Sequence, residues 1–425
     1  MNSLDENNLD RIAVIGLGYV GLPLAMLFVN KGFYVYGIDK DLDKIDKLRQ
    51  GKSYLSDLAD NQVQTLIDSG RFFGTDDYQT IEKVKAVILC VPTPLRDHRH
   101  PDLSYLQSAV QHLVPYMRRG QLFVLESTTF PGTTEEVLLP LLNQNKKWKV
   151  GEDFYVGYSP ERIDPGNKAF ALDEIPKVVS GVTDSCRQKV MDLYGKAFQT
   201  LVPVSSPKVA EMTKILENCQ RFVNISFINE MAILCHKMKI NIWDVIEAAK
   251  TKPYGFIPYY PGPGVGGHCI PVDPLYLLWK AKQYHTDLQF ITLAKQVNDG
   301  MPAYIIERLN QLLDMPLSHA RLLAVGLTYK KDVNDLRESM PLMIFEQLAK
   351  LTPYLDYHDP YQDQVHVDGK VYRSKPIDES LKQYDCVLIL TDHSAIDYQR
   401  LVKHAPLIFD TRGVIKGSYN HVETL

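Results

Sequence analysis

The segment from Arg11 to Asp39 constrains the fold of this chain more than any other part of the sequence. An apolar strand over 11–15 runs directly into Gly16-Leu-Gly18-Tyr19-Val20-Gly21, a helical stretch follows, and a second apolar strand ends at Asp39. Glycines at these positions let the backbone approach a pyrophosphate, and the N-terminus of the next helix presents N–H donors to it. The spacing therefore predicts a βαβ unit with a dinucleotide site at its first turn.

The carboxylate at the end of the second strand indicates which dinucleotide binds. Asp39 is placed to bind both hydroxyls of a ribose and would repel a 2′-phosphate, which favours NAD over NADP. Lys40 weakens this preference because its charge would attract that phosphate. The alternative is a glycine turn that matches the motif by coincidence.

Further apolar strands are expected over 85–91, 121–125 and 155–158. Ligands of open parallel sheets bind beyond the carboxyl ends of the strands, which is where Thr93, Thr128 and Glu161 stand. Either threonine alone is equally well explained as a hydroxyl that caps a loop. Glu161 alone is equally well explained as a structural carboxylate.

A long helix is predicted after Ser205-Ser-Pro207, because serine caps a helix and proline fits its first turn. The helical pattern continues to about Lys239, a length of roughly 45 Å, so we interpret it as a spine between two domains. Lys214 and Asn218 share one face of it and could reach a cleft. A solvated helix face is the alternative.

One of the six cysteines lies in backbone suited to close approach: Cys269, which follows Gly264, Gly266 and Gly267. A thiolate in such a loop suggests covalent catalysis, with Asp273 near enough to orient a water or a base. The alternative is a glycine-rich turn with a buried structural cysteine. The six cysteines show neither close pairing nor metal-ligand spacing, which favours the reducing cytoplasm and no metal.

The second half of the chain weakly repeats the pattern of apolar strands seen in the first half. Strands are expected over 321–327, 354–358, 385–390 and 406–409, but the first of them is not followed by G-x-G-x-x-G, so no second dinucleotide is expected. Its first loop carries Lys330, Lys331 and Arg337, which suits the pyrophosphate of another ligand. A solvated loop of mixed charge is the alternative.

Composition excludes other classes of function. A chain of 425 residues is too long for a single hydrophobic core and predicts two or three domains. A composition of 45% hydrophobic and 23% charged residues is ordinary for a globular protein. The net charge of -4 gives no basic footprint for nucleic acid. No apolar run has the length of a membrane helix, and the acidic N-terminus does not have the pattern of a signal peptide.

Taken together, these segments resemble the UDP-glucose/GDP-mannose dehydrogenase family from Ile12 to about Gly413. The most specific matches are Gly266-Gly-His-Cys-Ile-Pro-Val-Asp273, Gly326-Leu-Thr-Tyr-Lys-Lys-Asp332 with Leu336-Arg-Glu-Ser339, and Ser127-Thr-Thr-Phe-Pro-Gly-Thr133. The resemblance implies an α/β fold: an NAD-binding Rossmann-like domain (1–204), a central helical domain (205–300) and a UDP-binding Rossmann-like domain (301–425). It also implies a homodimer that uses two NAD to oxidise the C6 alcohol of a nucleotide sugar to a carboxylate.

The resemblance further implies residue roles. Cys269 forms a thiohemiacetal and then a thioester, Lys214 and Asn218 stabilise the oxyanion, and Asp273 activates water or relays protons. Thr128 and Glu161 resemble the residues that hold a catalytic water. The expected cofactor contacts are Gly16, Gly18, Tyr19, Val20, Gly21, Asp39, Lys40, Thr93, Thr128 and Arg337. The expected substrate contacts are Glu161, Arg162, Lys214, Asn218, Tyr259, Gly266, His268, Tyr329, Lys330 (the diphosphate) and Arg412 (sugar or phosphate).

The resemblance narrows the substrate without fixing it. Enzymes for UDP-glucose usually carry a lysine before the aspartate of this motif, whereas Val272 precedes Asp273 here. The run over 256–276 resembles the branch that acts on UDP-N-acetylhexosamines, in which the N-acetylglucosamine enzymes match best. The N-acetylgalactosamine, N-acetylmannosamine and glucose substrates remain alternatives. Two rival classes are a two-electron hydroxy acid dehydrogenase, which would not need Cys269, and a non-catalytic nucleotide-sugar sensor.

Overall fold

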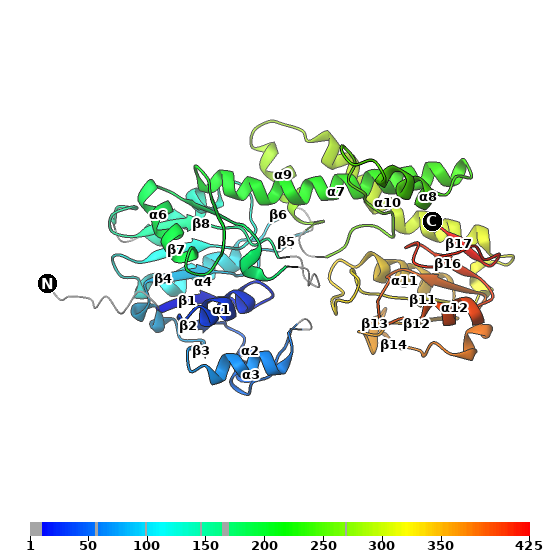
Figure 1. The fold of residues 1–425 in the computed structure, drawn as a ribbon, viewed down its shortest axis with the longest axis horizontal. Coiled ribbons are helices and arrows are strands. Elements are labelled where there is room, and N and C mark those ends of the chain that lie inside the picture. Colours follow the sequence, from blue (N-terminus) through cyan, green and yellow to red (C-terminus); the bar gives the residue numbers. More distant parts are fainter. Residues whose placement is uncertain (1–10, 56–57, 98–99, 145–146, 164–169, 268–269) are drawn as a thin grey trace. The chain divides into compact units, whose positions relative to one another are not determined.

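The protein, seen here as a computed structural model, is described over residues 11–55, 58–97, 100–144, 147–163, 170–267 and 270–425 (Figure 1). It divides into two compact units. The first unit holds Met1–Glu217 and Leu275–Thr286, and the second holds Asn218–Pro274 and Asp287–Leu425. Each unit contains a largely parallel sheet of its own.

The first unit is built on an eight-stranded sheet with the order β10-β9-β8-β7-β4-β1-β2-β3. The six neighbouring strands β8, β7, β4, β1, β2 and β3 are parallel and follow the order of a doubly wound dinucleotide-binding sheet. Strand β9 pairs antiparallel with β8. Their bounds are β1 (Arg11–Ile15), β2 (Tyr34–Ile38), β3 (Phe72–Thr75), β4 (Ala86–Leu89), β7 (Leu122–Leu125), β8 (Tyr155–Tyr158), β9 (Lys177–Gly181) and β10 (Leu201–Pro203). A short hairpin, β5 (Leu95–Arg96) with β6 (His100–Pro101), lies outside this sheet.

Both faces of this sheet are covered by helices, because alternate residues of each strand point to opposite sides. Ile12 and Val14 of β1 pack with the first helix and α6, while Ala13 and Ile15 pack with α4 and α5. This two-sided burial explains why the strands read as continuous apolar runs. The helix bounds are α1 (Gly21–Asn30), α2 (Leu42–Arg49), α3 (Asp60–Asp68), α4 (Ser104–Leu113), α5 (Leu139–Asn143), α6 (Asp184–Tyr194) and α9 (Asp273–Lys282).

The predicted long helix is confirmed as α7 (Pro207–Lys237), which has 31 residues and is drawn in green in Figure 1. It begins at Pro207, as expected of a proline that fits a first helical turn. It ends just before Lys239, whose φ of 59° is left-handed and cannot continue the helix. Asn241 then caps α8 (Ile242–Lys250), its side chain accepting the N–H of Trp243.

The second unit contains a five-stranded parallel sheet with the order β12-β11-β15-β16-β17. Leu322 and Ala324 pack under α10 and α11, and Leu323 and Val325 pack under α12. The prediction of an α/β chain with two Rossmann-like sheets is therefore confirmed. The bounds are α10 (Gln289–Leu312), β11 (Leu322–Val325), α11 (Met340–Leu351), β12 (Leu355–His358), β13 (Gln364–Val367), β14 (Lys370–Arg373), β15 (Cys386–Ile389), α12 (Tyr398–His404), β16 (Ile408–Asp410) and β17 (Val422–Thr424).

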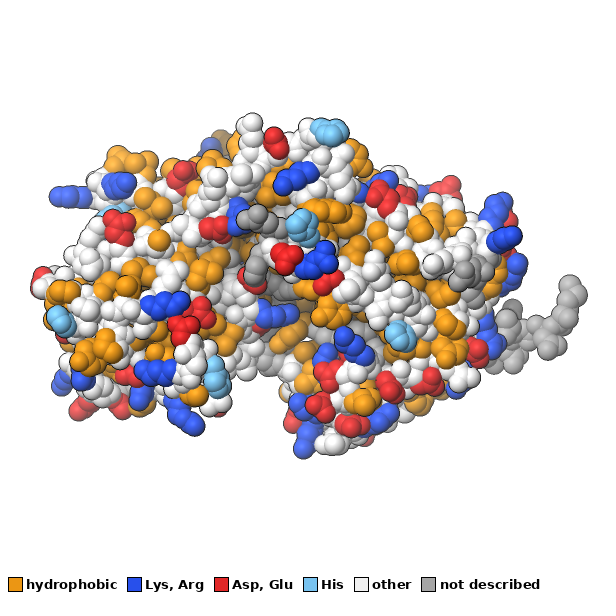
Figure 2. All heavy atoms as spheres, turned by 180° about the vertical axis from the view of Figure 1, so that it is seen from behind, with side chains coloured by type: hydrophobic (Ala, Val, Ile, Leu, Met, Phe, Trp, Pro, Cys, Tyr) orange, Lys and Arg blue, Asp and Glu red, His pale blue; other side chains and the backbone are white. Residues whose placement is uncertain are grey.

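The surface carries charges of both signs. Figure 2 shows lysine and arginine side chains interspersed with aspartate and glutamate over the face that it presents. Within the described part of the chain, no helix has the length and apolar character needed to cross a membrane.

Candidate functional site

The turn after β1 has the geometry of a dinucleotide-binding loop. Gly16 has a φ of 91°, and a Cβ there would lie 2.6 Å from the carbonyl oxygen of Cys90, so the turn packs tightly against the end of β4. A Cβ on Gly21 would collide with the carbonyl of Gly16, whereas a Cβ on Gly18 would meet nothing within 4 Å. No side chain caps the N-terminus of α1 at Val20. Open space at Gly18 and a helix N-terminus without a side-chain cap therefore stand where a pyrophosphate would bind.

Asp39 orders this turn from the end of β2. Its carboxylate is buried and accepts the N–H of Leu17 at 2.9 Å and the N–H of Asp41 at 3.0 Å. The ammonium of Lys44 lies 3.4 Å from the same carboxylate. Lys40, the expected cofactor contact beside it, instead places its ammonium 4.7 Å from the centre of the Tyr105 ring.

The remaining residues of the glycine motif serve the core as well. Tyr19 and Val20 are partly buried and pack on the apolar cluster beneath α1. Tyr54 donates from its hydroxyl to the carbonyl of Leu17. Burial, with the nearby charge of Asp39, raises the pKa of Tyr54, so its proton stays in that bond.

The loops after β4 and β7 are joined by hydroxyl groups. Thr93 donates from Oγ1 to the carbonyl of Thr128 at 2.7 Å, and Ser127 donates to the carbonyl of Val91 at 2.7 Å. The Thr93 hydroxyl thus caps a loop, which is the plainer of the two interpretations of its sequence position. Thr128 is half-buried, and its own hydroxyl has no hydrogen-bond partner in the part of the chain that the structure describes.

Helix α7 places one buried carboxylate against the loop that follows Thr128, and it also carries a buried lysine. Glu211 is fully buried and accepts the N–H of Gly132 at 2.5 Å, the N–H of Thr134 at 2.9 Å and the Thr134 hydroxyl at 2.7 Å. Burial outweighs these bonds and raises the pKa of Glu211 to about 7. Lys214, one turn later, is only 9% exposed, yet it has no hydrogen-bond or ion-pair partner among the described residues. Such a lysine is suited to meet an oxygen of a ligand.

Glu161 stands beyond the end of β8, as predicted. Its Oε1 accepts the N–H of Arg162 and the N–H of Ile163, each at 2.6 Å, and its Oε2 lies 3.4 Å from the ammonium of Lys177. The guanidinium of Arg162 pairs with Glu217 at 2.7 Å, so this expected substrate contact is held by a neighbouring carboxylate. Sequence reasoning missed Lys177, because a single lysine at the start of a strand carries no signal.

In the second unit, two predicted catalytic side chains meet. Asn218 of α7 donates from Nδ2 to the carboxylate of Asp273, and both side chains are buried. Burial and the charge of Asp273 raise the pKa of the neighbouring Cys219 to about 12, so that thiol is not a nucleophile. His268 and Cys269 lie outside the described residues.

The glycine loop before Cys269 is pressed against the loop that follows β11. A Cβ on Gly266 would lie 2.6 Å from the carbonyl of Glu338, and one on Gly267 would lie 2.5 Å from the Tyr329 ring. Gly267 has a φ of 91° and donates its N–H to the carbonyl of Arg337 at 3.2 Å. Only glycine fits at these contacts, and the structure thereby brings together two expected substrate residues, Gly266 and Tyr329.

Three other predicted residues have protein partners. A Cβ on Gly262 would collide with the guanidinium of Arg412, which places Arg412 beside the glycine loop, and its Nε also donates to Asp392 at 3.2 Å. The guanidinium of Arg337 makes a double contact with Asp335, at 3.0 and 2.6 Å. Tyr259 packs on the apolar cluster of α7 and α8.

The loop of Lys330 and Lys331 is anchored by a histidine that sequence reasoning missed. His393 is buried, with Nε2 3.3 Å from Asp359 and 3.1 Å from the Thr328 hydroxyl. Its Nδ1 accepts the N–H of Asp332 at 3.0 Å. Burial opposes ionisation of Asp359, but the hydrogen bonds that it accepts from His393 and from the N–H groups of Leu327 and Tyr361 hold the pKa of Asp359 below its usual value.

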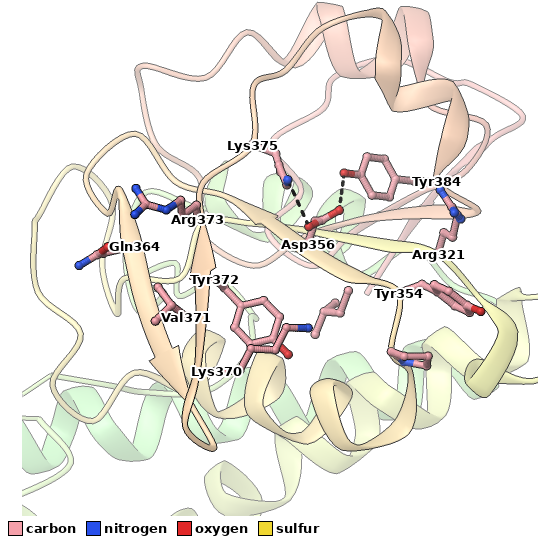
Figure 3. Close-up of a pocket in the computed structure, with 12 residues that line it drawn as sticks. Arg321, Tyr354, Asp356, Gln364, Lys370, Val371, Tyr372, Arg373, Lys375 and Tyr384 are labelled. Atoms are coloured by element: carbon pink, nitrogen blue, oxygen red, sulfur yellow. Dashed lines mark hydrogen bonds and ion pairs between the residues drawn. The ribbon is translucent and has the colours of Figure 1, made fainter.

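A cavity of ≈ 570 Å³ lies at the other edge of this sheet, where β11, β12 and β15 begin. Figure 3 shows Lys375 and Tyr384 converging on Asp356, at 3.9 and 2.9 Å. Two further cations lie over tyrosine rings of the same cavity, Arg321 over Tyr354 and Lys370 over Tyr372. These internal pairings, and the rule that parallel sheets bind ligands at carboxyl ends, favour the opposite edge as the functional one.

No group of His, Cys, Asp and Glu in the described ranges is arranged to hold a metal ion. The glycine turn, the uncapped start of α1 and the acceptor Asp39 do fit a dinucleotide.

Comparison with known proteins covers nearly the whole chain. Three models of the UDP-glucose/GDP-mannose dehydrogenase family match it: the NAD binding domain at residues 10–198, the central domain at 208–300 and the UDP binding domain at 323–417. The chain is 36% identical over 415 residues to the UDP-N-acetyl-D-glucosamine 6-dehydrogenase of Pseudomonas aeruginosa, covering 95% of this chain and 96% of that protein.

Two other relatives point to a different sugar. A UDP-N-acetyl-D-mannosamine dehydrogenase of Methanococcus maripaludis is 31% identical over 423 residues, covering 96% of this chain and 94% of that protein. The solved structure of a UDP-D-ManNAc dehydrogenase from Pyrococcus horikoshii superposes with a TM-score of 0.88 and 32% identity, covering 97% and 98% of the two chains.

Proposed function

The chain belongs to the UDP-glucose/GDP-mannose dehydrogenase family and is an NAD-dependent oxidoreductase of nucleotide sugars, and from that premise we propose that it oxidises the C6 alcohol of UDP-N-acetylglucosamine to the uronic acid. Family membership replaces the two rival interpretations, a hydroxy acid dehydrogenase and a non-catalytic sensor. The relative named for N-acetylglucosamine supports the choice of sugar by its identity of 36%, against 31% and 32% for the two N-acetylmannosamine enzymes quoted above.

The observation that carries the proposal is the set of polar side chains on one face of α7. Lys214 is buried without a hydrogen-bond or ion-pair partner among the described residues, and Asn218, one turn later, is paired with Asp273. An ammonium and an amide on the same helical face suit the oxyanion that develops when a nucleophile adds to an aldehyde. In this proposal Asp273 exchanges protons with that oxygen or with water.

Cys269 supplies the nucleophile in this proposal. NAD would be held by the turn at Gly16 and by Asp39, and when bound it supplies the hydride acceptor for each of the two oxidations. Oxidation of the alcohol gives an aldehyde, whose carbon is attacked by the Cys269 thiolate to form a thiohemiacetal. Loss of a second hydride leaves a thioester, and water then cleaves its C–S bond to release the acid and the thiolate. Thr128 and Glu161 hold that water.

The stoichiometry of NADH tests the proposal. The measurement is NADH formed per molecule of sugar consumed, with UDP-N-acetylglucosamine beside UDP-N-acetylgalactosamine, UDP-N-acetylmannosamine and UDP-glucose. We expect two NADH per sugar and the highest kcat/KM for UDP-N-acetylglucosamine. Cys269→Ala should still bind NAD and the UDP-sugar but form no acid. One NADH per sugar, or undiminished acid formation by Cys269→Ala, contradicts the covalent route.

We also propose that the chain acts as a cytoplasmic homodimer with domains at 1–204, 205–300 and 301–425. Large apolar side chains are exposed on the helices of the second unit, among them Phe227 and Leu234 of α7 and Phe290 and Leu293 of α10. Surface of this kind on several neighbouring helices is suited to burial against a second copy. The five cysteines within the described residues are free thiols, which supports a reducing compartment.

A further inference from the structure

A cluster of charged side chains is buried in the first unit behind Glu161. Glu126, directly after β7, is 0% exposed, and Lys177, the first residue of β9, is 3% exposed. The ammonium of Lys177 lies 2.7 Å from Glu126, 3.2 Å from the carbonyl of Pro160 and 3.4 Å from Glu161. An ammonium has three N–H donors, so these contacts use all of them.

Lys177 completes the fixation of the Glu161 carboxylate. The Oε1 atom of Glu161 is held by the backbone N–H groups of Arg162 and Ile163, while Oε2 faces Lys177. Because backbone hydrogen bonds fix Oε1, the carboxylate can change its orientation mainly by moving Oε2. The position of the Lys177 ammonium therefore decides where Oε2 points.

Glu126 competes with Glu161 for the same ammonium. It is the nearer partner of Lys177, and its other oxygen accepts the hydroxyl of Tyr194 at 2.5 Å. The groups that face Glu126 are Cys90 at the end of β4, Lys177, Glu161 and Tyr194 of α6. Burial raises the pKa of Glu126 to about 7, against the opposing charge of Lys177. Near neutral pH, Glu126 is therefore partly ionised. The ammonium of Lys177 faces the carboxylate of Glu161 alone when Glu126 is protonated, and both carboxylates when Glu126 is ionised.

A buried charged cluster of this kind is costly to desolvate, and packing alone does not require it. Its place beside a residue expected to hold the catalytic water gives it a use. We propose that Lys177 is a positioning residue for the hydrolysis of the thioester, that it orients the Glu161 carboxylate, and that Glu126 regulates this by drawing the ammonium away when it is ionised. The inference rests on the proposed function.

The step that Lys177 would assist is balanced without a further reagent. The water oxygen bonds to the acyl carbon of the thioester, the C–S bond breaks, and the sulfur of Cys269 leaves as a thiolate. One proton of the water passes to Asp273, the base proposed above to activate it, while Glu161 holds the water, and the other proton is lost from the new carboxylic acid. No hydride moves in this step, so an effect on it separates cleanly from effects on NADH formation.

The test uses a double variant, Lys177→Met/Glu126→Gln, because removing Lys177 alone would leave a buried carboxylate without its cation and endanger folding. The matched control is Lys189→Met, an exposed lysine of α6 in the same unit. For each protein we would measure the thermal midpoint, the Kd of NAD, the pre-steady-state burst of NADH, and the mass of the Cys269 peptide after quenching.

We expect the double variant to bind NAD as the wild type does and to show a burst of up to two NADH per active site. Steady-state turnover should then fall by roughly tenfold or more, with an acyl adduct accumulating on Cys269. Equal losses in NAD binding, burst rate and thermal midpoint, with no adduct, would mean a structural role only and overturn the inference. Wild-type protein that forms one NADH per sugar would overturn the proposed function instead.

Glu126→Gln alone tests the regulatory part. It places a neutral acceptor where the protonated acid stands at low pH, and so leaves Lys177 to Glu161 at every pH. We expect its hydrolysis rate to match that of the wild type near pH 6 and to exceed it increasingly toward about pH 8, as Glu126 ionises in the wild type. A rate ratio that does not change with pH would refute the regulatory role of Glu126.

Discussion

Replacing Asp39 with serine should shift the cofactor preference from NAD toward NADP. The carboxylate holds the turn through the N–H of Leu17 and lies 3.4 Å from the ammonium of Lys44. A hydrogen bond to a charged group contributes about 1.5–3 kcal/mol, so loss of a ribose contact should lower kcat/KM for NAD about ten- to hundredfold. Removing the carboxylate also ends a repulsion of about 1–4 kcal/mol with a 2′-phosphate and frees Lys44 to pair with it.

The two effects have opposite signs for the two cofactors, so the ratio of kcat/KM for NAD to that for NADP should fall by at least about a hundredfold. The assay is initial-rate kinetics with both dinucleotides at a saturating UDP-sugar, with the thermal midpoint measured in parallel. Asp43→Ser removes an exposed carboxylate from the first turn of α2 and is the control. If rates with NAD and NADP fall by the same factor in Asp39→Ser, the carboxylate only supports the turn, and the assignment of Asp39 to the ribose is refuted.

Three further predictions concern stability, the glycine loop and assembly. Because burial raises the pKa of Glu211 to about 7, the folded state binds its proton more tightly than the unfolded state, and stability falls as the pH rises through that value. Between about pH 5 and pH 8, urea unfolding should show the free energy of unfolding of the wild type falling by about 3 kcal/mol, a fall that Glu211→Gln lacks. The same dependence of this free energy on pH in both proteins would contradict the prediction. Gly267→Ala should slow turnover while leaving NAD affinity unchanged, because its Cβ would lie 2.5 Å from the Tyr329 ring; unaltered kcat would exclude a tight contact. Phe290→Asp should give a monomer in light scattering, and a persistent dimer would move the interface away from α10.

The sequence predicted the features that have local causes. The first turn, the strand ending at Asp39 and the helix beginning at Pro207 each follow from residues adjacent in the chain, and the structure has them where they were expected. Six of the predicted strands are shorter in the structure; the strand expected over 85–91, for example, is Ala86–Leu89. Apolar residues continue past the last ladder bond there because the loop itself is buried.

Contacts between distant segments could not be predicted in the same way. Glu211 reaches the N–H groups at Gly132 and Thr134, and Lys177 reaches Glu126, only because parallel strands and α7 bring these segments together. A buried carboxylate and an exposed one have the same letter in the sequence. The Thr93 hydroxyl shows the converse: its position at a strand end was predicted, but which of two uses it serves depends on where the carbonyl of Thr128 lies.

The first turn of each sheet contains a glycine with a positive φ and an aspartate that accepts a backbone N–H. Comparing the two turns shows which residues of the dinucleotide motif shape the turn and which bind the ligand. Gly326 follows β11 with a φ of 82°, and a Cβ there would collide with Thr391, which follows the neighbouring strand β15, as a Cβ on Gly16 would collide with Cys90 after β4. Asp359 accepts the N–H of Leu327 at 2.7 Å, as Asp39 accepts that of Leu17.

The later glycines are what differ between these turns. In the first sheet Gly18 leaves open space before α1, whereas the first turn of the second sheet is followed by the loop of Tyr329, whose ring contacts Gly267. The first glycine and an aspartate that accepts a backbone N–H are therefore requirements of a doubly wound turn, and their presence alone does not indicate that a dinucleotide binds. The second and third glycines carry the information on the dinucleotide, so their absence after β11 is the reason to expect a different nucleotide there.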